Sequence, residues 1–323
     1  IDLMVYIKSS YGRRVKMDDI ASATLGKKKT SHGLVAVQWW NEGKIDEIKI
    51  KLILKNKQKP KLDRFRFASI MPNSEEWNKL HMNGIKTEKR IYTASQIPNI
   101  LGCGYKSRFH YWQVLKGFKK EEFISNPAVL HGVTYEPLAK DQFARKFQDF
   151  LILDCGMIIH DQYEFIGATP DAIILTKDNE FATFEAKCPF SAKHKDEIKD
   201  DEQKLKEFYL QPKYVVQVML QMAVMKATVG YLHFFFADEE EDHRGITFEI
   251  PFFNDLFEFI VERVQEFDKQ LNDDSFIMEN RQKKKITKKL LASGEPLSED
   301  QVNEKIFRDM LDVWIDKVIK IIC

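Results

Sequence analysis

Apolar and polar residues follow two periods along the chain, and these predict alternating helices and strands between residues 76 and 271. Short runs rich in branched and aromatic residues favour strands, whereas stretches with apolar positions three or four apart favour helices. The predicted strands are Leu151–Leu153, Met157–His160, Ala172–Leu175, Phe181–Ala186, Val229–Ala237 and Thr247–Pro251. The predicted helices are 76–82, 94–101, 108–116, Pro212–Lys226 and Asp255–Leu271, with a long helix that begins near Pro137 and runs through Phe147.

This order of elements predicts an α/β fold in which helices flank a central mixed sheet. The pattern assigns residues 75–274 to that domain. Residues 1–48 are predicted as a helical N-terminal appendage and residues 49–74 as a basic linker. Residues 275–323 have apolar positions at helical spacing and are predicted as a helical C-terminal tail.

Basic residues gather in two runs, although 50 basic and 49 acidic side chains leave a net charge of only +1. Residues 49–66 contain eight Lys or Arg and one acid, and residues 281–289 are almost purely basic. Because the net charge is so small, a polyanionic partner has to be bound by a local patch. Each run can be a solvated linker or a phosphate-binding segment, and the sequence leaves both open. The acidic run at 238–242 is predicted as a loop.

Composition excludes several classes of protein. Hydrophobic residues make up 44% and charged residues 31%, which is globular rather than disordered composition. The richest apolar run, 231–237, is much shorter than the ~18 residues that a membrane helix needs, and no basic-apolar leader opens the sequence. The four cysteines form no CxxC pair, which argues against a zinc ribbon, an iron–sulfur cluster or a disulfide framework. We expect an intracellular protein of the cytoplasm or nucleus of a host cell, neither secreted nor bound to a membrane.

Three charged side chains carry the main chemical signal of the sequence. Glu185 and Lys187 are two residues apart on a predicted strand, so they project from the same face. Asp171 begins the preceding strand, and a hairpin can bring all three side chains together. The alternative for such a pattern is a surface ladder of salt bridges.

Two converging carboxylates offer the oxygen ligands that a hard divalent cation prefers. Mg²⁺ at this site could activate a water and stabilise the charge that builds up on a phosphodiester, and we expect Mn²⁺ to substitute. The lysine could position or deprotonate that water, or neutralise the phosphorane. This chemistry predicts a nuclease.

Three further features strengthen the nuclease hypothesis. Glu136 lies at the head of the predicted long helix, where packing does not require a carboxylate. Gln217 lies on a helix that is otherwise apolar. Arg90 precedes a Thr and a Ser at the entry to a helix, which is a suitable setting for binding a phosphate.

These motifs occur in an order that resembles a known family. Residues 76–270 are similar to the lambda-exonuclease/YqaJ-type viral recombinase nucleases of the PD-(D/E)xK superfamily, whose relatives include the alkaline nucleases of large DNA viruses. The matching segments are Trp77-Asn-Lys-Leu80, Thr93-Ala-Ser95, Gly132 to Glu136, Thr169-Pro-Asp171, Glu185-Ala-Lys-Cys-Pro-Phe190 and Tyr214-Val-Val-Gln217.

The resemblance implies a role for each matching residue. Asp171, Glu185 and the Ala186 carbonyl would bind the metal, and Lys187 would activate the water. Glu136 and Gln217 would line the site as further catalytic residues. Arg90 and Ser95 would bind the 5′ phosphate of the degraded strand, with Lys86 and Lys89 as open alternatives to Arg90. Asp161 matches an acidic position near the family's site, and Tyr214 an aromatic one that can equally be a packing residue.

Two segments depart from this pattern. Residues 1–50 resemble the tail of DEDD-type, RNase H-like 3′→5′ exonucleases, but the final metal-binding aspartate and the earlier acidic motifs of that fold are missing. We therefore interpret them as a remnant and not as a second active site. The charged stretch Lys193–Lys206 is expected to be a mobile loop near DNA.

We expect a Mg²⁺-dependent DNA exonuclease that degrades linear duplex DNA 5′→3′ and leaves 3′ single-stranded tails for recombination or repair. The resemblance implies duplex DNA ends as substrate, a single-strand annealing protein as partner, and a homo-trimer. A structure-specific or restriction-like endonuclease with the same core is one alternative. A catalytically silent DNA-binding recombination scaffold is the other, although such a module would have no use for Asp171, Glu185 and Lys187 together.

Overall fold

A computed structural model of the chain describes seven segments. They are residues 65–67, 90–120, 127–190, 201–237, 245–278, 299–318 and 320–322. The predicted appendage 1–48, the helix at 76–82, most of the basic linker, the acidic run and the basic run at 281–289 lie outside the described residues.

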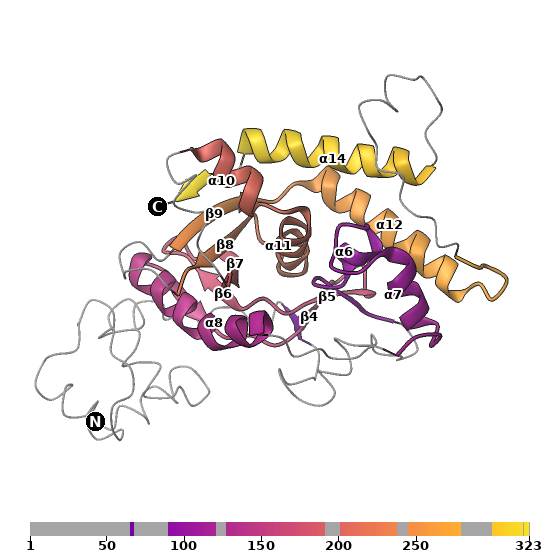
Figure 1. Cartoon of the computed structure of the whole chain (residues 1–323). Coiled ribbons are helices and arrows are strands. Elements are labelled where there is room, and N and C mark those ends of the chain that lie inside the picture. The colour runs from indigo at the N-terminus through magenta and orange to yellow at the C-terminus, as the bar shows by residue number, and fades with distance from the viewer. Residues whose placement is uncertain are drawn as a thin grey trace, which may run out of the picture.

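A mixed sheet of six strands forms the centre of the fold (Figure 1). Its order is β10-β9-β8-β7-β6-β3, and every neighbouring pair is antiparallel except β7 and β8, which are parallel. The strands are β3 Leu151–Leu153, β6 Ala172–Leu175, β7 Phe181–Lys187, β8 Val229–Phe235, β9 Gly245–Pro251 and β10 Lys320–Ile322. Five of these strands match the predicted ones to within two residues at each end.

A second, smaller sheet lies beside the first and was only partly predicted. Its order is β1-β4-β5-β2, with β2 parallel to β5 and the other pairs antiparallel. The strands are β1 Arg66–Phe67, β2 Tyr92–Thr93, β4 Ile158–Ile159 and β5 Ile166–Ala168. Only β4 falls in a predicted strand, because two or three residues are too few for a period of two to stand out.

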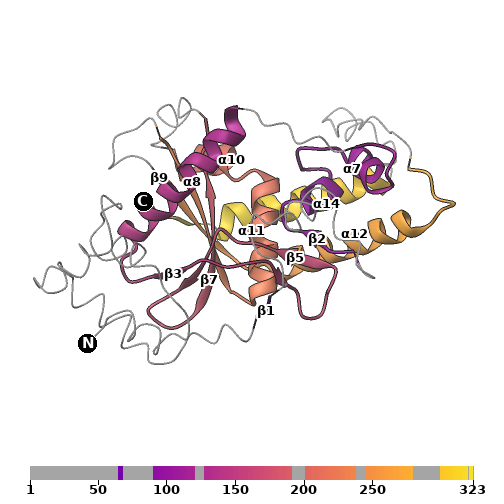
Figure 2. The same cartoon turned by 90° about the horizontal axis from the view of Figure 1, so that it is seen from below.

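Helices cover both faces of the larger sheet (Figures 1 and 2). On one face α8, Pro127–Lys146, packs on β7 and β8, with the Phe143 and Phe184 rings 4.6 Å apart. On the other face lie α11, Pro212–Met225, and beyond it α12, Asn254–Asn272. The remaining helices are α6 Ile97–Ile100, α7 Arg108–Leu115, α10 Glu202–Tyr209 and α14 Glu299–Val318.

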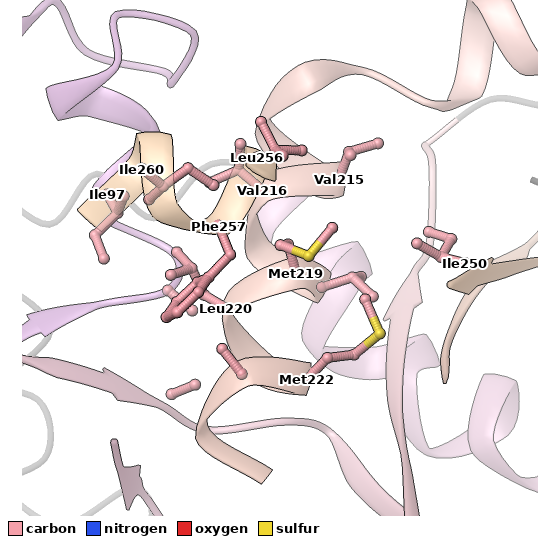
Figure 3. Close-up of a cluster of buried hydrophobic side chains, with 14 of the residues drawn as sticks. Ile97, Val215, Val216, Met219, Leu220, Met222, Ile250, Leu256, Phe257 and Ile260 are labelled. Carbon is pink, nitrogen blue, oxygen red and sulfur yellow. The ribbon is translucent and has the colours of Figure 1, made fainter. Parts of the chain in front are cut away.

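Helix α11 is the centre of the hydrophobic core (Figure 3). It contacts β7 and β8 of the larger sheet, β4 and β5 of the smaller sheet, and the helices α6 and α12. The helix can lie this close to the sheet because β8 has a glycine beneath it: a Cβ at Gly230 would lie 2.5 Å from Val218 Cγ1 and 2.8 Å from Thr183 Cγ2. Because of this close packing, Gln217 and Gln221 of α11 contact Glu185 of β7.

The structure corrects two predicted boundaries. Helix α8 begins at Pro127 and not at Pro137, which lies inside it. A proline there removes one backbone hydrogen bond, and this costs less where Val133, the residue four positions earlier, is exposed to water. The charged stretch Lys193–Lys206 is not all loop, because α10 begins at Glu202 after the N-cap Asp201.

The C-terminal tail is part of the core and not wholly helical. In α14 the Trp314 side chain is buried and its ring stacks on Phe253 at 6.3 Å. After α14, β10 pairs with β9 at the edge of the larger sheet. In the part of the chain that the structure describes, no helix combines the length and the apolar character needed to span a membrane.

Candidate active site

The β6–β7 hairpin brings together the two carboxylates that the sequence singled out. Ala172 pairs with Phe184, so the preceding Asp171 lies opposite Glu185 across the two strands. The Asp171 Oδ2 atom accepts a hydrogen bond from the backbone N–H of Ala186 at 2.7 Å. The predicted convergence of Asp171, Glu185 and Lys187 is therefore present in the structure, at the ends of adjacent strands.

Glu185 is almost completely buried, with 2% of its surface exposed, and its carboxylate is held by side-chain donors. Gln217 Nε2 donates to Oε1 at 2.6 Å, and Gln221 Nε2 donates to Oε2 at 2.5 Å. Lys187 Nζ also donates to Oε1 at 2.5 Å. A buried carboxylate requires such partners, because an unpaired charge in this position would be strongly destabilising.

Among the described contacts, the ammonium of Lys187 is the only positive charge that forms an ion pair with Glu185. Its side chain is 22% exposed, and its ammonium also donates to Gln217 Oε1 at 3.3 Å. Burial by itself lowers the pKa of Lys187, but the neighbouring charges, that of Glu185 first and then that of Asp171, raise it above the usual range. The lysine is thus held as an ammonium at the edge of the site.

Glu136 completes a cluster of three acidic groups. Burial raises the pKa of Glu136, and the charge of Glu185 raises it further, against the opposing effect of Lys140. Burial also raises the pKa of Asp171 well above its usual value, and the charges of Glu185 and Glu136 add to this. The three carboxylates therefore repel one another, and a bound cation would relieve the repulsion.

The donor set fits a hard divalent cation. Mg²⁺ usually keeps several waters and binds one or two carboxylates, which here would be those of Asp171 and Glu185, beside the Ala186 main chain. Among the residues that the structure describes, no group of three or more acidic, histidine or cysteine side chains is placed to hold a metal ion by itself. Waters or substrate oxygens would have to complete the coordination.

Cys188 directly follows β7 but is not suited to nucleophilic chemistry. Burial, followed by the charges of Glu136 and Asp171, raises the pKa of its thiol to about 12. A thiol with this pKa is protonated near neutral pH, and only the thiolate is a strong nucleophile. Cys188 is therefore poorly suited to forming a covalent intermediate.

Sequence comparison finds a similarity between this part of the chain and a known domain. Residues 76–229 match the family model of the YqaJ-like viral recombinase domain. The mixed fold, with sheets flanked by helices, confirms the architecture expected from the motifs. No curated protein matches the chain at a significant level.

Solved structures resemble the chain at low identity. An alkaline exonuclease from Laribacter hongkongensis is 22% identical, with a TM-score of 0.48 over 61% of this chain and 92% of that one. Its complex with dAMP is 23% identical, with a TM-score of 0.49 over the same shares. A phage-related exonuclease from Haemophilus somnus 129PT is 16% identical, with a TM-score of 0.40 over 56% of this chain and 93% of that one.

The two predicted phosphate-binding residues that the structure describes, Ser95 and Arg90, have different described neighbours. Ser95 follows β2, which runs parallel to β5 and so ends near the segment that leads to Asp171. The Ser95 hydroxyl lies 3.2 Å from that of Thr93. Arg90 precedes β2 and is close enough to Tyr92 for its charge to oppose the rise in the pKa of that tyrosine. The joint role of Arg90 and Ser95 in binding a 5′ phosphate stays a prediction.

The two remaining candidate site residues, Asp161 and Tyr214, lie in different parts of the structure. Asp161 forms an ion pair with Lys226 at 2.5 Å, at the C-terminal end of α11. Lys226 is nine residues beyond Gln217, or about 14 Å along a helix, so the described partner of Asp161 is remote from the carboxylates. Tyr214 lies at the site, because Lys187 Nζ is 5.1 Å from the centre of its ring.

Gln221 is a further residue of this site, and the sequence analysis did not single it out. It is fully buried, and besides donating to Glu185 it accepts a hydrogen bond from Thr183 Oγ1 at 3.1 Å. A spacing of four puts it on the same helical face as Gln217. A second glutamine at this spacing in an apolar helix is a signal that could have identified it.

Replacing Gln221 with leucine should reduce stability and activity together. The substitution leaves the buried Oε2 of Glu185 and the hydroxyl of Thr183 without their partner, and a lost hydrogen bond to a buried charge costs about 2–3 kcal/mol. Urea unfolding and a cleavage assay at a temperature where the variant is folded would measure both effects. Met222→Leu, a volume-conserving change at the next residue, is the control and should cost less than about 1.5 kcal/mol. Unchanged stability of the Gln221→Leu variant would contradict the role assigned to this hydrogen bond.

Proposed function

We propose that the protein is a metal-dependent deoxyribonuclease that acts as an exonuclease on linear duplex DNA. One observation carries the proposal: Asp171, Glu185 and Lys187 converge at the ends of two neighbouring strands, within the segment that matches the YqaJ-like viral recombinase family model. A structural salt-bridge ladder would have no need of a buried carboxylate with three donors. Hydrolysis of a phosphodiester needs a cation, a positioned water and a positive charge near the phosphate, and this cluster can supply or hold each of them.

Each side chain has a distinct task in this proposal. Asp171 and Glu185, with the Ala186 carbonyl, would hold the cation, for which Mg²⁺ is the natural choice and Mn²⁺ a substitute. When bound, the cation would lower the pKa of a water and neutralise developing negative charge. Gln217 orients the Lys187 ammonium, which can donate to the scissile phosphate or to the attacking water. Glu136, which projects from α8, lines the site from the opposite side of the hairpin.

The direction of attack is proposed to be 5′→3′, with the 5′ phosphate as the feature that marks a DNA end. The exposed Ser95 hydroxyl lies close to the segment that leads to Asp171, where it can donate to a phosphate oxygen, and the buried Thr93 hydroxyl lies 3.2 Å from it. The basic partner of these hydroxyls remains open among Arg90, Lys86 and Lys89. Degradation in this direction leaves 3′ single strands, the substrate of a single-strand annealing protein. A ring-shaped trimer would suit processive degradation.

Substrates that differ only in their ends test this function. The full chain is incubated with linear duplex DNA bearing a 5′ phosphate, the same duplex with a 5′ hydroxyl, and a covalently closed circle, each with Mg²⁺ or with EDTA. We expect the phosphorylated duplex to be degraded fastest, the hydroxyl form more slowly, and the circle not at all. A terminal phosphate carries more charge than an internal diester, and hydrogen bonds to it are charge-assisted. Activity should be absent in EDTA.

The same experiment separates the alternatives. Cleavage of closed circles at the rate of linear DNA would replace the exonuclease with an endonuclease. Binding of DNA without cleavage under any metal condition would identify a silent scaffold. Release of a 3′ label before a 5′ label would reverse the proposed direction.

A further inference from the structure

A single exposed tyrosine stands at the edge of the active site, on a tightly built turn. Tyr105 is 79% exposed and lies between α6 and α7. The backbone N–H groups of Cys103 and Gly104 donate to the Pro98 carbonyl, and that of Lys106 donates to Asn99 Oδ1. A Cβ on Gly104 would lie 2.2 Å from the same oxygen, so the turn requires glycine there.

Contacts connect Tyr105 to the catalytic lysine through α11. The hydroxyls of Tyr105 and Tyr214 are 3.1 Å apart. Lys213 Nζ lies 3.9 Å from the centre of the Tyr105 ring and 4.8 Å from that of Tyr214. Lys187 Nζ lies 5.1 Å from the centre of the Tyr214 ring. The residues thus form a continuous row from Lys187 outward to solvent.

This row combines a fixed aromatic surface with a cation beside it. Lys213 lies over one face of the Tyr105 ring, and the large exposed fraction leaves the other face open to solvent. A rigid turn removes the entropy that a flexible tyrosine would lose on binding, which favours a recognition surface. Packing within the protein does not explain the ring, because most of its surface makes no contact.

Resting on the proposed nuclease function, we propose that Tyr105 is a stacking platform for the base of an unpaired nucleotide close to the scissile phosphate, with Lys213 contacting the neighbouring backbone phosphate. Bases stack on aromatic rings in proteins that hold single strands, and a nearby ammonium adds attraction to the phosphate. Every base has a flat face, so the platform should serve all four bases alike. It would hold the strand in line with Lys187.

Fluorescence of 2-aminopurine tests the platform directly. The full-length protein is titrated in EDTA against 5′-phosphorylated duplexes with frayed ends that carry 2-aminopurine at each of the first three 5′ positions in turn. Stacking should quench the fluorescence at one of these positions in the wild type and not in Tyr105→Leu. The Kd should rise about 5- to 100-fold in that variant, the usual effect of losing one stacked base. Lys213→Gln should reduce the salt dependence of binding by about 0.7 in slope, as for one phosphate contact.

Two further variants decide between stacking and other roles. Tyr105→Phe keeps the ring but loses the hydroxyl contact with Tyr214, and should retain both quenching and Kd. Phe118→Leu removes another exposed aromatic, beyond the far end of α7, and should have no effect on either. The platform is refuted if Tyr105→Leu binds like the wild type, or if Tyr105→Phe is as defective as Tyr105→Leu. A wild type that neither binds nor cuts DNA would instead overturn the proposed function itself.

Discussion

Replacing Lys187 with alanine should reduce DNA cleavage by about 100-fold or more while leaving DNA affinity nearly unchanged. The loss is that expected on removing a group that donates to the water or to charge developing in the transition state. The fold should survive, because Gln217 and Gln221 continue to donate to the buried Glu185 carboxylate. Single-turnover cleavage rates and binding titrations in EDTA measure the two quantities separately.

Lys177 provides a matched control on the same hairpin. It is an exposed lysine in the β6–β7 loop, so Lys177→Ala should retain wild-type cleavage. Near-wild-type turnover of Lys187→Ala would refute the catalytic assignment. An equal loss of binding and cleavage would mean that the lysine holds the DNA in its ground state and does not act selectively on the transition state.

Replacing Asp171 with asparagine should abolish most metal-dependent activity without unfolding the protein. The amide oxygen can still accept the hydrogen bond from the Ala186 N–H, but the negative charge that attracts a cation is lost. Because Asp171 lies with Glu185 and Glu136 in a cluster of repelling carboxylates, the variant in EDTA should be as stable as the wild type or more so. Calorimetric titration with Mg²⁺ should show weaker binding, and the rise in Tm on adding Mg²⁺ should shrink.

Asp178→Asn is the corresponding control, since Asp178 is exposed in the loop of the same hairpin. It should change neither the affinity for Mg²⁺ nor the activity. If Asp171→Asn also binds Mg²⁺ with unchanged affinity, the functional cation lies elsewhere. Failure of Mg²⁺ to raise the Tm of the wild type would lead to the same conclusion.

The sequence alone was sufficient for the core of the site. Asp171, Glu185 and Lys187 belong to two strands joined by a short turn, and a period of two places alternate side chains on one face. Gln217 was also predictable, as a polar residue in an apolar helix. These are local relations, within a hairpin or a single helix, and local relations can be read from spacing.

Tertiary structure decided the features that depend on contacts between distant segments. Gln221 donates to Glu185 only because α11 packs closely on β7 and on Gly230 of β8. The hydroxyls of Tyr105 and Tyr214 are in contact although the two residues are more than a hundred positions apart in the sequence. The spacing of residues cannot show which helix packs on which strand. The small sheet and the pairing of β10 with β9 are likewise products of long-range contacts.

The same distinction explains where the sequence was misleading. Pro137 was a sound signal for a helix start, yet α8 continues through it because Ala139 and Phe143 are buried against the sheet. Sequence thus determined the chemistry of this protein and most of its elements. The packing of α11 between the two sheets decided which side chains surround that chemistry, because burial and close contact depend on the whole fold.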